Sequence, residues 1–230
     1  MRAYLVLPAG AEPVPAVVYL HWLGSDATAN RTEFLDEGVA IAGRGLASLH
    51  IQGRFPWVES PSGVEKDRAG ILGQLIDMRR GVDYLAARPD IDPSRLAVVG
   101  HDFGAMYGPL LARVDNRLDG VVVMAGVPHW ADWFVRYWHP LAGLSESDYR
   151  ALLVDLDPVT AVPAIAPRPI LFQWAALDSF VDEQHRNEFI AAAGPPKESK
   201  VYDTVHPLDD PAATSDRDAW LIHLLSPAGG

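Results

Sequence analysis

The chain has 230 residues, 49% of them hydrophobic, and carries a formal net charge of −11 at pH 7. This length and composition predict one globular domain with a sizeable core, and the negative charge disfavours nucleic acid and anionic membranes as partners. The absence of cysteine excludes disulfides, thiolate metal ligands and a cysteine nucleophile. The apolar run before Pro8 is short, and no segment has the roughly 18 consecutive apolar residues of a membrane helix. We therefore expect neither a signal peptide nor a membrane span, and a cytoplasmic location by default.

Segments rich in β-branched and aliphatic residues predict strands, and helical patterns separate them. The strands are expected at residues 17–21, 46–51, 95–99, 120–124, 169–174 and 199–202, with a candidate edge strand at 2–7. Such strands are typical of an α/β fold with a mostly parallel sheet and helices on both faces. An aromatic- and proline-rich stretch at about 129–167 breaks the alternation. It predicts a small helical insertion over the active site within a single domain, residues 1–230.

Apolar residues at helical spacing place three helices. They are expected at about residues 69–88, at 103–114 and at 216–225. Pro109 lies inside the second pattern and predicts a kink, because proline lacks the backbone N–H that a helix interior uses.

The sharpest local signal is Gly100-His-Asp-Phe-Gly104, which follows an apolar strand and opens a helix. This pattern is typical of a nucleophile elbow, a sharp turn that exposes its central side chain at the carboxyl end of the sheet. The central residue is Asp102, and no serine occupies a G-x-S-x-G motif in the chain. An aspartate here could merely cap the helix, but its position in the elbow favours a role as nucleophile.

In this arrangement the chain resembles the α/β-hydrolase superfamily over nearly its whole length. The order of strand, His21-Trp-Leu-Gly24 loop, elbow, insertion, acid and histidine is similar to that of dienelactone hydrolases and acetyl xylan esterases. The elbow itself is similar to that of epoxide hydrolases and dehalogenases, which use an aspartate nucleophile. The resemblance implies a triad in the order nucleophile, acid, histidine. It assigns the acid to Asp178 and the histidine to His206, each after a predicted strand.

An aspartate nucleophile favours attack on a saturated carbon. Its carboxylate, with a reference pKa near ~3.9, is ionised at neutral pH and needs no base. Opening an epoxide or displacing a halide leaves an ordinary ester, which His206, oriented by Asp178, can hydrolyse through an activated water. The same attack on an ester would give a reactive anhydride. The lead hypothesis is therefore a hydrolase of a small, largely apolar substrate of epoxide or halide type.

The backbone N–H groups of Phe103 and Leu23 are the candidate oxyanion donors. Here the sequence departs from the families it resembles. Trp22 stands where glycine is usual after the loop histidine. Phe103 stands where haloalkane dehalogenases have a halide-binding Trp and haloacetate dehalogenases have an Arg.

The insertion supplies candidates for substrate binding. Tyr137 and Trp138 are the residues we assign to this role, and Tyr137 or Tyr149 could polarise an epoxide as cap tyrosines do in epoxide hydrolases. His129 and His139 lie in the same stretch, but no further ligand cluster accompanies them, so we expect no metal site.

Three alternatives stay open at this point. The acid could be Asp182 or Asp132 instead of Asp178. The enzyme could be a dienelactone hydrolase-like carboxylesterase or lactonase, in which Asp102 attacks an acyl carbon or acts as a base on water. The chain could also be a non-catalytic hydrolase fold that binds a ligand. In each enzymatic case we expect no cofactor and a small-molecule substrate as partner, while the sequence gives no oligomeric state.

Overall fold

The computed structural model of the chain describes every residue except 1, 11, 25–29, 55–64, 139–142 and 228–230. In the part described, one sheet has the strand order β1-β3-β2-β4-β5-β6-β7, with β1 antiparallel to β3 and the other neighbours parallel. This confirms the predicted α/β fold. The strands are β1 (Ala3–Val6), β2 (Val14–Leu20), β3 (Ala47–Ile51), β4 (Ile91–His101), β5 (Leu118–Met124), β6 (Ile170–Ala175) and β7 (Lys197–Tyr202).

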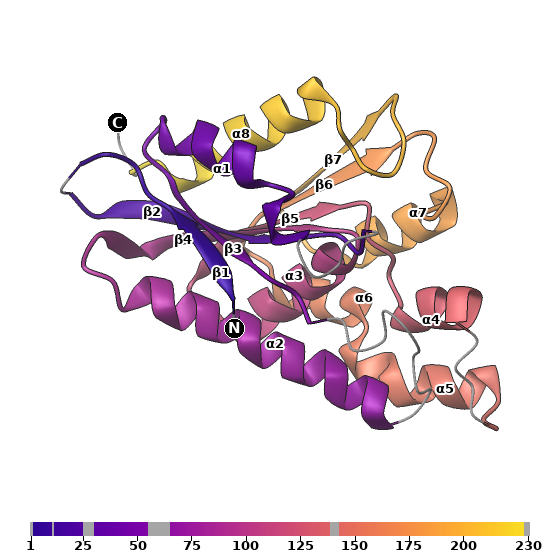
Figure 1. Cartoon of the computed structure of the whole chain (residues 1–230). Coiled ribbons are helices and arrows are strands. Elements are labelled where there is room, and N and C mark those ends of the chain that lie inside the picture. The colour runs from indigo at the N-terminus through magenta and orange to yellow at the C-terminus, as the bar shows by residue number, and fades with distance from the viewer. Residues whose placement is uncertain (1, 11, 25–29, 55–64, 139–142, 228–230) are drawn as a thin grey trace.

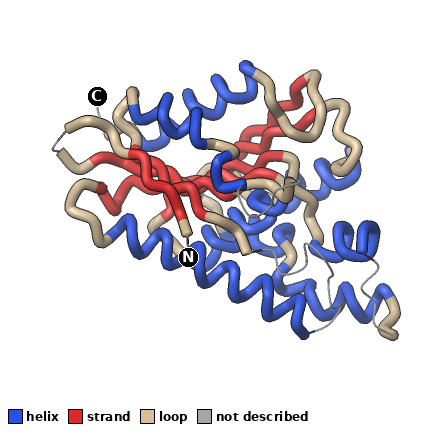
Figure 2. Tube along the Cα trace, in the orientation of Figure 1, coloured by secondary structure: helices blue, strands red, loops and turns tan. Residues whose placement is uncertain are grey.

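Helices cover both faces of the sheet, as the blue tubes on either side of the red strands show (Figures 1 and 2). On one face lie α1 (Leu35–Ala42) and α8 (Pro211–Leu225), and on the other lie α2 (Glu65–Ala86) and α3 (Phe103–Val114). The last helix begins ahead of its predicted start because Asp210 caps it, accepting hydrogen bonds from the N–H groups of Ala212 (2.8 Å) and Ala213 (3.1 Å). The second predicted helix, α3, runs as one element through Pro109.

The segment between β5 and β6 lies beyond the carboxyl ends of the strands (Figure 1). It contains α4 (Trp130–Trp138), α5 (Glu146–Leu153) and α6 (Pro158–Ala161), and α7 (Glu183–Ala192) follows β6. Trp130 of α4 is fully buried, and its ring lies 4.9 Å from that of Tyr107 and 6.0 Å from that of Phe103. The segment is thereby packed onto the helix that follows Asp102.

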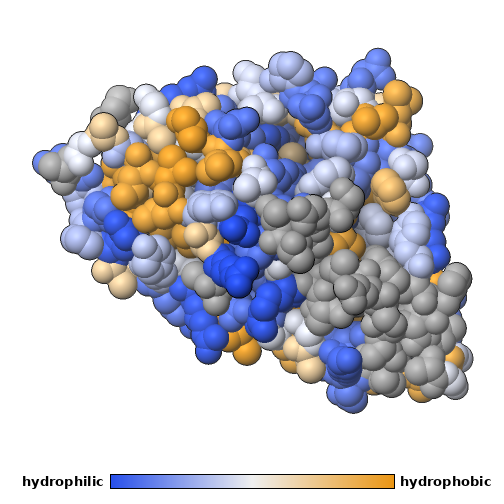
Figure 3. Space-filling model, in the orientation of Figure 1, coloured by the Kyte–Doolittle hydropathy of each residue, from blue (hydrophilic) through white to orange (hydrophobic). Residues whose placement is uncertain are grey.

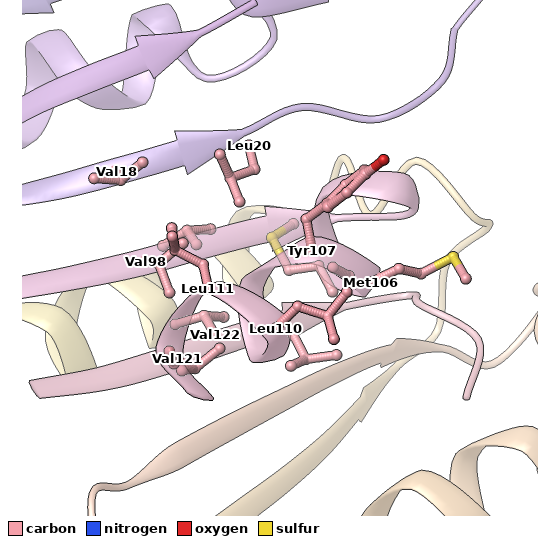
Figure 4. Packing of buried hydrophobic residues seen from close by; sticks show 14 of the residues in the cluster. Val18, Leu20, Val98, Met106, Tyr107, Leu110, Leu111, Val121 and Val122 are labelled. Carbon is pink, nitrogen blue, oxygen red and sulfur yellow. The ribbon is translucent and has the colours of Figure 1, made fainter. Parts of the chain in front are cut away.

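The centre of the core lies between α3 and the middle strands (Figure 4). Leu110 and Leu111 of α3 lie against Val98 of β4 and Val121 of β5, and all four are at most 2% exposed. Burying side chains of this size contributes roughly 1.5–3 kcal/mol each. The strand and the helix that flank Asp102 are therefore firmly held.

The β1 edge of the sheet differs from this interior. Apolar side chains gather on the surface over that edge (Figure 3), where Tyr4 is 41% and Leu7 38% exposed. Within the described residues, none of the helices combines the length and the apolar character that crossing a membrane requires.

Candidate active site

Asp102 lies at the sharp turn between β4 and α3. Its backbone has φ 53° and ψ −112°, a conformation that residues with side chains rarely adopt. The turn packs so tightly that a Cβ on Gly100 would lie 2.1 Å from the carbonyl oxygen of Gly104, and one on Gly104 would lie 1.9 Å from that of Leu20. Both positions require glycine, which is the steric basis of the elbow pattern in the sequence.

The carboxylate of Asp102 is buried, with 2% of the residue exposed. Its Oδ2 accepts a hydrogen bond of 2.9 Å from the backbone N–H of Leu23, in the loop after β2. Its Oδ1 has no hydrogen-bond partner in the part of the chain described and lies 3.8 Å from Nε2 of His206. A buried carboxylate oxygen without a hydrogen bond costs free energy, so this atom makes Asp102 a candidate functional residue.

His206 lies in the loop after β7 and faces Asp178, in the loop after β6. Nδ1 of His206 lies 2.9 Å from Oδ2 and 3.1 Å from Oδ1 of Asp178. Asp178 also accepts hydrogen bonds from the backbone N–H groups of Phe180 (2.8 Å) and Val181 (3.0 Å). These bonds fix the carboxylate, and the carboxylate fixes the histidine ring with Nε2 toward Asp102.

The two alternative acids have other partners. Asp132 pairs with Arg150 at 2.6 Å and with His185 at 3.5 Å. Asp182 caps α7 by accepting a 2.9 Å hydrogen bond from the N–H of His185. Among the three candidates, the one that contacts His206 is Asp178.

The carboxylate of Asp178 and His206 shift each other's pKa values. Burial disfavours a charge on His206, but the carboxylates of Asp102 and Asp178 outweigh it and raise the pKa of His206 to about 9. Burial likewise disfavours ionised Asp178, yet His206 and the two backbone N–H groups lower the pKa of this carboxyl. His206 therefore holds its proton more tightly than a free histidine does, and any loss of the negative charge beside it would make it a stronger acid.

Two residues that the sequence analysis did not assign to chemistry complete the polar surroundings. Glu33 accepts a 2.7 Å hydrogen bond from the N–H of Trp22 and lies 2.6 Å from Nδ1 of His101. Nε2 of His101 donates to the carbonyl oxygen of His206 at 3.0 Å. Glu33 has no motif of its own, so no sequence signal pointed to it. His101 belongs to the elbow motif, but a histidine beside the nucleophile position does not reveal its partners from the sequence.

Aromatic rings surround His206 on its open side. The ring of Phe180 lies 4.8 Å from it and that of Trp133 6.2 Å, and Tyr137 packs against both Trp133 (5.1 Å) and Phe180 (5.9 Å). Burial raises the pKa of Tyr137; Asp178 and Asp102 add to this and Arg136 opposes it. Tyr137 thus lies within electrostatic range of the candidate nucleophile.

A pocket of about 240 Å³ adjoins these rings. It is lined by Val127, Asp132, Trp133, Val135, Arg136, Tyr137, Glu146, Arg150, Phe180 and His185. Tyr149 does not contribute: its hydroxyl donates to Asp67 at 2.9 Å in a buried contact with α2. The side chain of Trp138, the other residue predicted to bind substrate, lies outside the described residues.

The remaining predicted residues have the following surroundings. Phe103 is the first residue of α3, and its ring is buried 5.6 Å from that of Trp133; its N–H stays a predicted oxyanion donor. His129 lies between Asp157 (2.7 Å) and Glu188 (2.8 Å). His139 lies outside the described residues, and within them no group of metal-binding side chains is found.

Comparison with known proteins gives partial sequence matches. No protein-family model matches the chain. The chain is 30% identical over 120 residues, 52% of its length, to the quorum-quenching protein AidA of Acinetobacter baumannii. It is 32% identical over 126 residues, 53% of its length, to the esterase EstD of Thermotoga maritima. These matches span 38% and 29% of the two relatives, so the chain covers about a third of each.

Similarity of structure extends much further. The acetyl xylan esterase from Paenibacillus sp. R4 aligns with 96% of this chain and 78% of its own, with a TM-score of 0.73 at 20% sequence identity. The chain has the α/β-hydrolase fold. On this fold Asp102, Asp178 and His206 follow β4, β6 and β7 and meet at the carboxyl edge of the sheet.

Proposed function

We propose that this chain is a hydrolase in which Asp102 attacks a saturated carbon and forms a covalent ester, which His206 and Asp178 then hydrolyse. The relatives named as an esterase and a quorum-quenching protein support a hydrolase in general. The finer proposal, an aspartate nucleophile, rests on the residue present in the elbow and on its contacts.

The observation that carries the proposal is that the two carboxylate oxygens of Asp102 have different contacts. Oδ2 already bonds the N–H of Leu23, the predicted oxyanion donor. An acyl-transfer enzyme would keep such a donor for the carbonyl oxygen of its substrate. Oδ1 is without a hydrogen bond and is the atom closer to His206. This arrangement suits attack by Oδ1, after which Oδ2 is the carbonyl oxygen of the new ester and is already held by its donor.

The proton balance fits this sequence of steps. In the first step an Oδ1–carbon bond forms and the bond to the leaving oxygen or halide breaks, with the electron pair going to the leaving atom. An opened epoxide takes up the proton of the His206 imidazolium and becomes an alcohol. A halide leaves as the anion, and in that case His206 gives its proton to solvent once its pKa has fallen. Because the ester is neutral, His206 no longer faces a charged Asp102, and its pKa falls below the resting value of about 9.

Neutral His206 can then remove a proton from water that attacks Cγ of Asp102. The bond between Cγ and Oδ1 breaks, the second proton of the water passes to Oδ1, and the product alcohol leaves with Oδ1. The oxygen of water remains in the carboxylate, and His206 is left as the imidazolium. Developing charge on Oδ2 is stabilised by the N–H of Leu23. The aromatic rings around His206 support a small, largely apolar epoxide, or an alkyl halide, as substrate. The pocket of about 240 Å³ beside them has room for a small molecule, and its lining combines aromatic and aliphatic side chains with charged ones, among them Asp132, Arg136 and Arg150.

The test is to stop the reaction at the ester. In H206Q, which keeps a neutral group in place of the base, incubation with styrene oxide should add the mass of one epoxide to the protein. A bromoalkane should add the mass of its alkyl group, the substrate less HBr. Peptide mapping should locate either adduct at Asp102. The double variant D102N/H206Q is the matched control and should stay unmodified. Absence of any adduct in H206Q with epoxide and halide probes contradicts the proposal.

A second candidate is an ester or lactone hydrolase in which Asp102 acts as a base on water, and the name of the relative from Thermotoga maritima, an esterase, favours it. A single turnover with excess enzyme in heavy-oxygen water separates the candidates. The covalent route on a saturated carbon incorporates the label into Asp102, whereas base catalysis places it only in the product. Label found only in the product would therefore replace the first proposal with the second.

A further inference from the structure

We infer that Glu33 and His101 are positioning residues that hold the oxyanion donor and the catalytic histidine in register with Asp102. The inference rests on the proposed function, because it assumes that Leu23 and His206 serve the reaction. It adds a polar network that the triad does not contain.

Glu33 bridges two loops that are distant in the sequence. It follows the short helix at Asn30–Thr32, and its Oε2 accepts a 2.7 Å hydrogen bond from the N–H of Trp22. Trp22 directly precedes Leu23, whose N–H bonds Asp102. The other oxygen, Oε1, lies 2.6 Å from Nδ1 of His101, the residue before Asp102. One carboxylate thus fixes the distance between the donor loop and the elbow.

His101 continues this connection to the third part of the site. It is 1% exposed, and its Nε2 donates to the backbone carbonyl oxygen of His206 at 3.0 Å. Its ring stacks on that of Trp22, with centroids 5.6 Å apart and planes 6° apart, and lies 5.4 Å from the ring of His206. Oxygen atoms of Glu33 and of the His206 backbone thus face the two ring nitrogens of His101, so the ring links the two groups directly.

The network joins the loop after β2, the elbow after β4 and the loop after β7. Each loop supplies one reacting group, and small displacements of such groups are costly, about 10²-fold in rate for roughly 1 Å. Without Glu33, the N–H of Trp22 and Nδ1 of His101 lose their common acceptor, and the three loops are no longer tied together through side chains. The predicted consequence is a lower kcat with little change in KM.

The substitution E33Q separates position from charge. The amide oxygen of glutamine can accept from the N–H of Trp22, and its NH₂ group can donate to a neutral His101, which still donates through Nε2 to His206. E33A removes all of this. We expect E33A to lower kcat by about 10²-fold and E33Q by less than about 5-fold. N30A is the matched control. Within the described residues it removes the 3.0 Å hydrogen bond from the Asn30 side chain to the carbonyl oxygen of Trp22 and leaves the contacts of Glu33 in place, so kcat should stay within roughly 2-fold.

A second measurement needs no substrate. The NMR signal of the His206 proton bonded to Asp178 should be kept in E33Q and shifted or broadened in E33A. If the proposed function fails, this signal still reports whether Glu33 positions His206. Equal losses in E33Q and E33A would show that charge, not position, matters. Wild-type kcat and an unchanged signal in E33A would overturn the inference outright, as would a kcat loss in E33A that only matches a loss of folded protein in thermal unfolding.

Discussion

Two buried clusters of charged side chains lie in different parts of this molecule. One is the candidate active site at the carboxyl edge of the sheet, and the other joins α1 to α8. In the second, the buried guanidinium of Arg217 bonds both oxygens of Glu37 and, at 2.7 Å, Oε1 of Gln173. Glu37 also accepts a 2.9 Å hydrogen bond from the hydroxyl of Tyr19. The buried guanidinium of Arg217 is therefore held on several sides by hydrogen bonds within the fold.

Asp102, the buried carboxylate of the candidate active site, has fewer hydrogen bonds. Asp102 has one hydrogen bond to its Oδ2, none to its Oδ1 in the described structure, and a strained backbone. Its histidine neighbour is 3.8 Å away, an ion pair without a hydrogen bond. In the α1–α8 cluster the contacts of Glu37 and Arg217 favour stability, whereas the strained Asp102 with its unbonded oxygen costs stability, as expected for the nucleophile that we propose.

The largest difference between the two clusters is expected for the substitution D102N. Removing the nucleophile should lower turnover by about 10⁴-fold or more, while stability should change by no more than about 1 kcal/mol, because the amide oxygen can still accept from Leu23. Steady-state kinetics and urea unfolding measure the two effects. A D102N protein that keeps its activity would make Asp102 a structural residue like those of the α1–α8 cluster.

The same variant tests the electrostatics of the site. Asp102 is one of the two carboxylates that raise the pKa of His206 to about 9. In D102N only Asp178 remains, so the pKa of His206 should fall. An NMR titration of the histidine ring protons in wild type and D102N measures this directly. An unchanged pKa would mean that Asp102 does not act on His206 as the mechanism requires.

The opposite pattern is expected for R217M. Losing the guanidinium leaves Glu37 buried and unpaired, which should destabilise the protein by about 3–5 kcal/mol. Turnover per folded molecule should stay close to that of wild type. Urea unfolding gives the first quantity, and kinetics corrected for the folded fraction gives the second. In the control R217M/E37L, where no charge is left unpaired, much of the stability should return; equal loss in both variants would argue against a buried ion pair as the cause.

Short patterns in the sequence predict the alternation of strands and helices, the elbow, and the chain order of Asp102, Asp178 and His206. These three residues follow strands, and the carboxyl ends of parallel strands lie at one edge of the sheet. The choice of Asp178 over Asp182 depends on contacts between loops, which no spacing encodes.

The partners of Glu33 show the same limit more strongly. Its contact with His101 joins residues 68 positions apart, and its type and position match no motif. No sequence pattern predicts the α1–α8 cluster either, since Glu37 and Arg217 are 180 positions apart. Networks of this kind follow from the assembled fold.

The smallest expected effect is a difference in pH-dependent stability between Asp218 and Asp216, two aspartates of α8 that differ in burial. Burial and the nearby Glu37 raise the pKa of Asp218 to about 6, against the attraction of Arg217 and Arg44. Lys200 and Tyr202, against a smaller effect of burial, lower that of Asp216. The folded state therefore binds a proton at Asp218 more tightly than the unfolded state does, and this residue loses stabilising power as pH rises from about 4 to about 6.

D218N removes that penalty, so it should stabilise the protein at pH 8 by on the order of 1 kcal/mol and much less at pH 4. D216N is the matched control on the same helix. A lowered pKa stabilises above the unfolded value and is lost as pH falls, so D216N should destabilise at pH 8, by a few tenths of a kcal/mol because the pair is partly exposed. Urea midpoints at both pH values measure the two shifts. Shifts of the same sign in D218N and D216N would contradict the idea that the burial of each aspartate, and not the loss of one negative charge, determines its effect on stability.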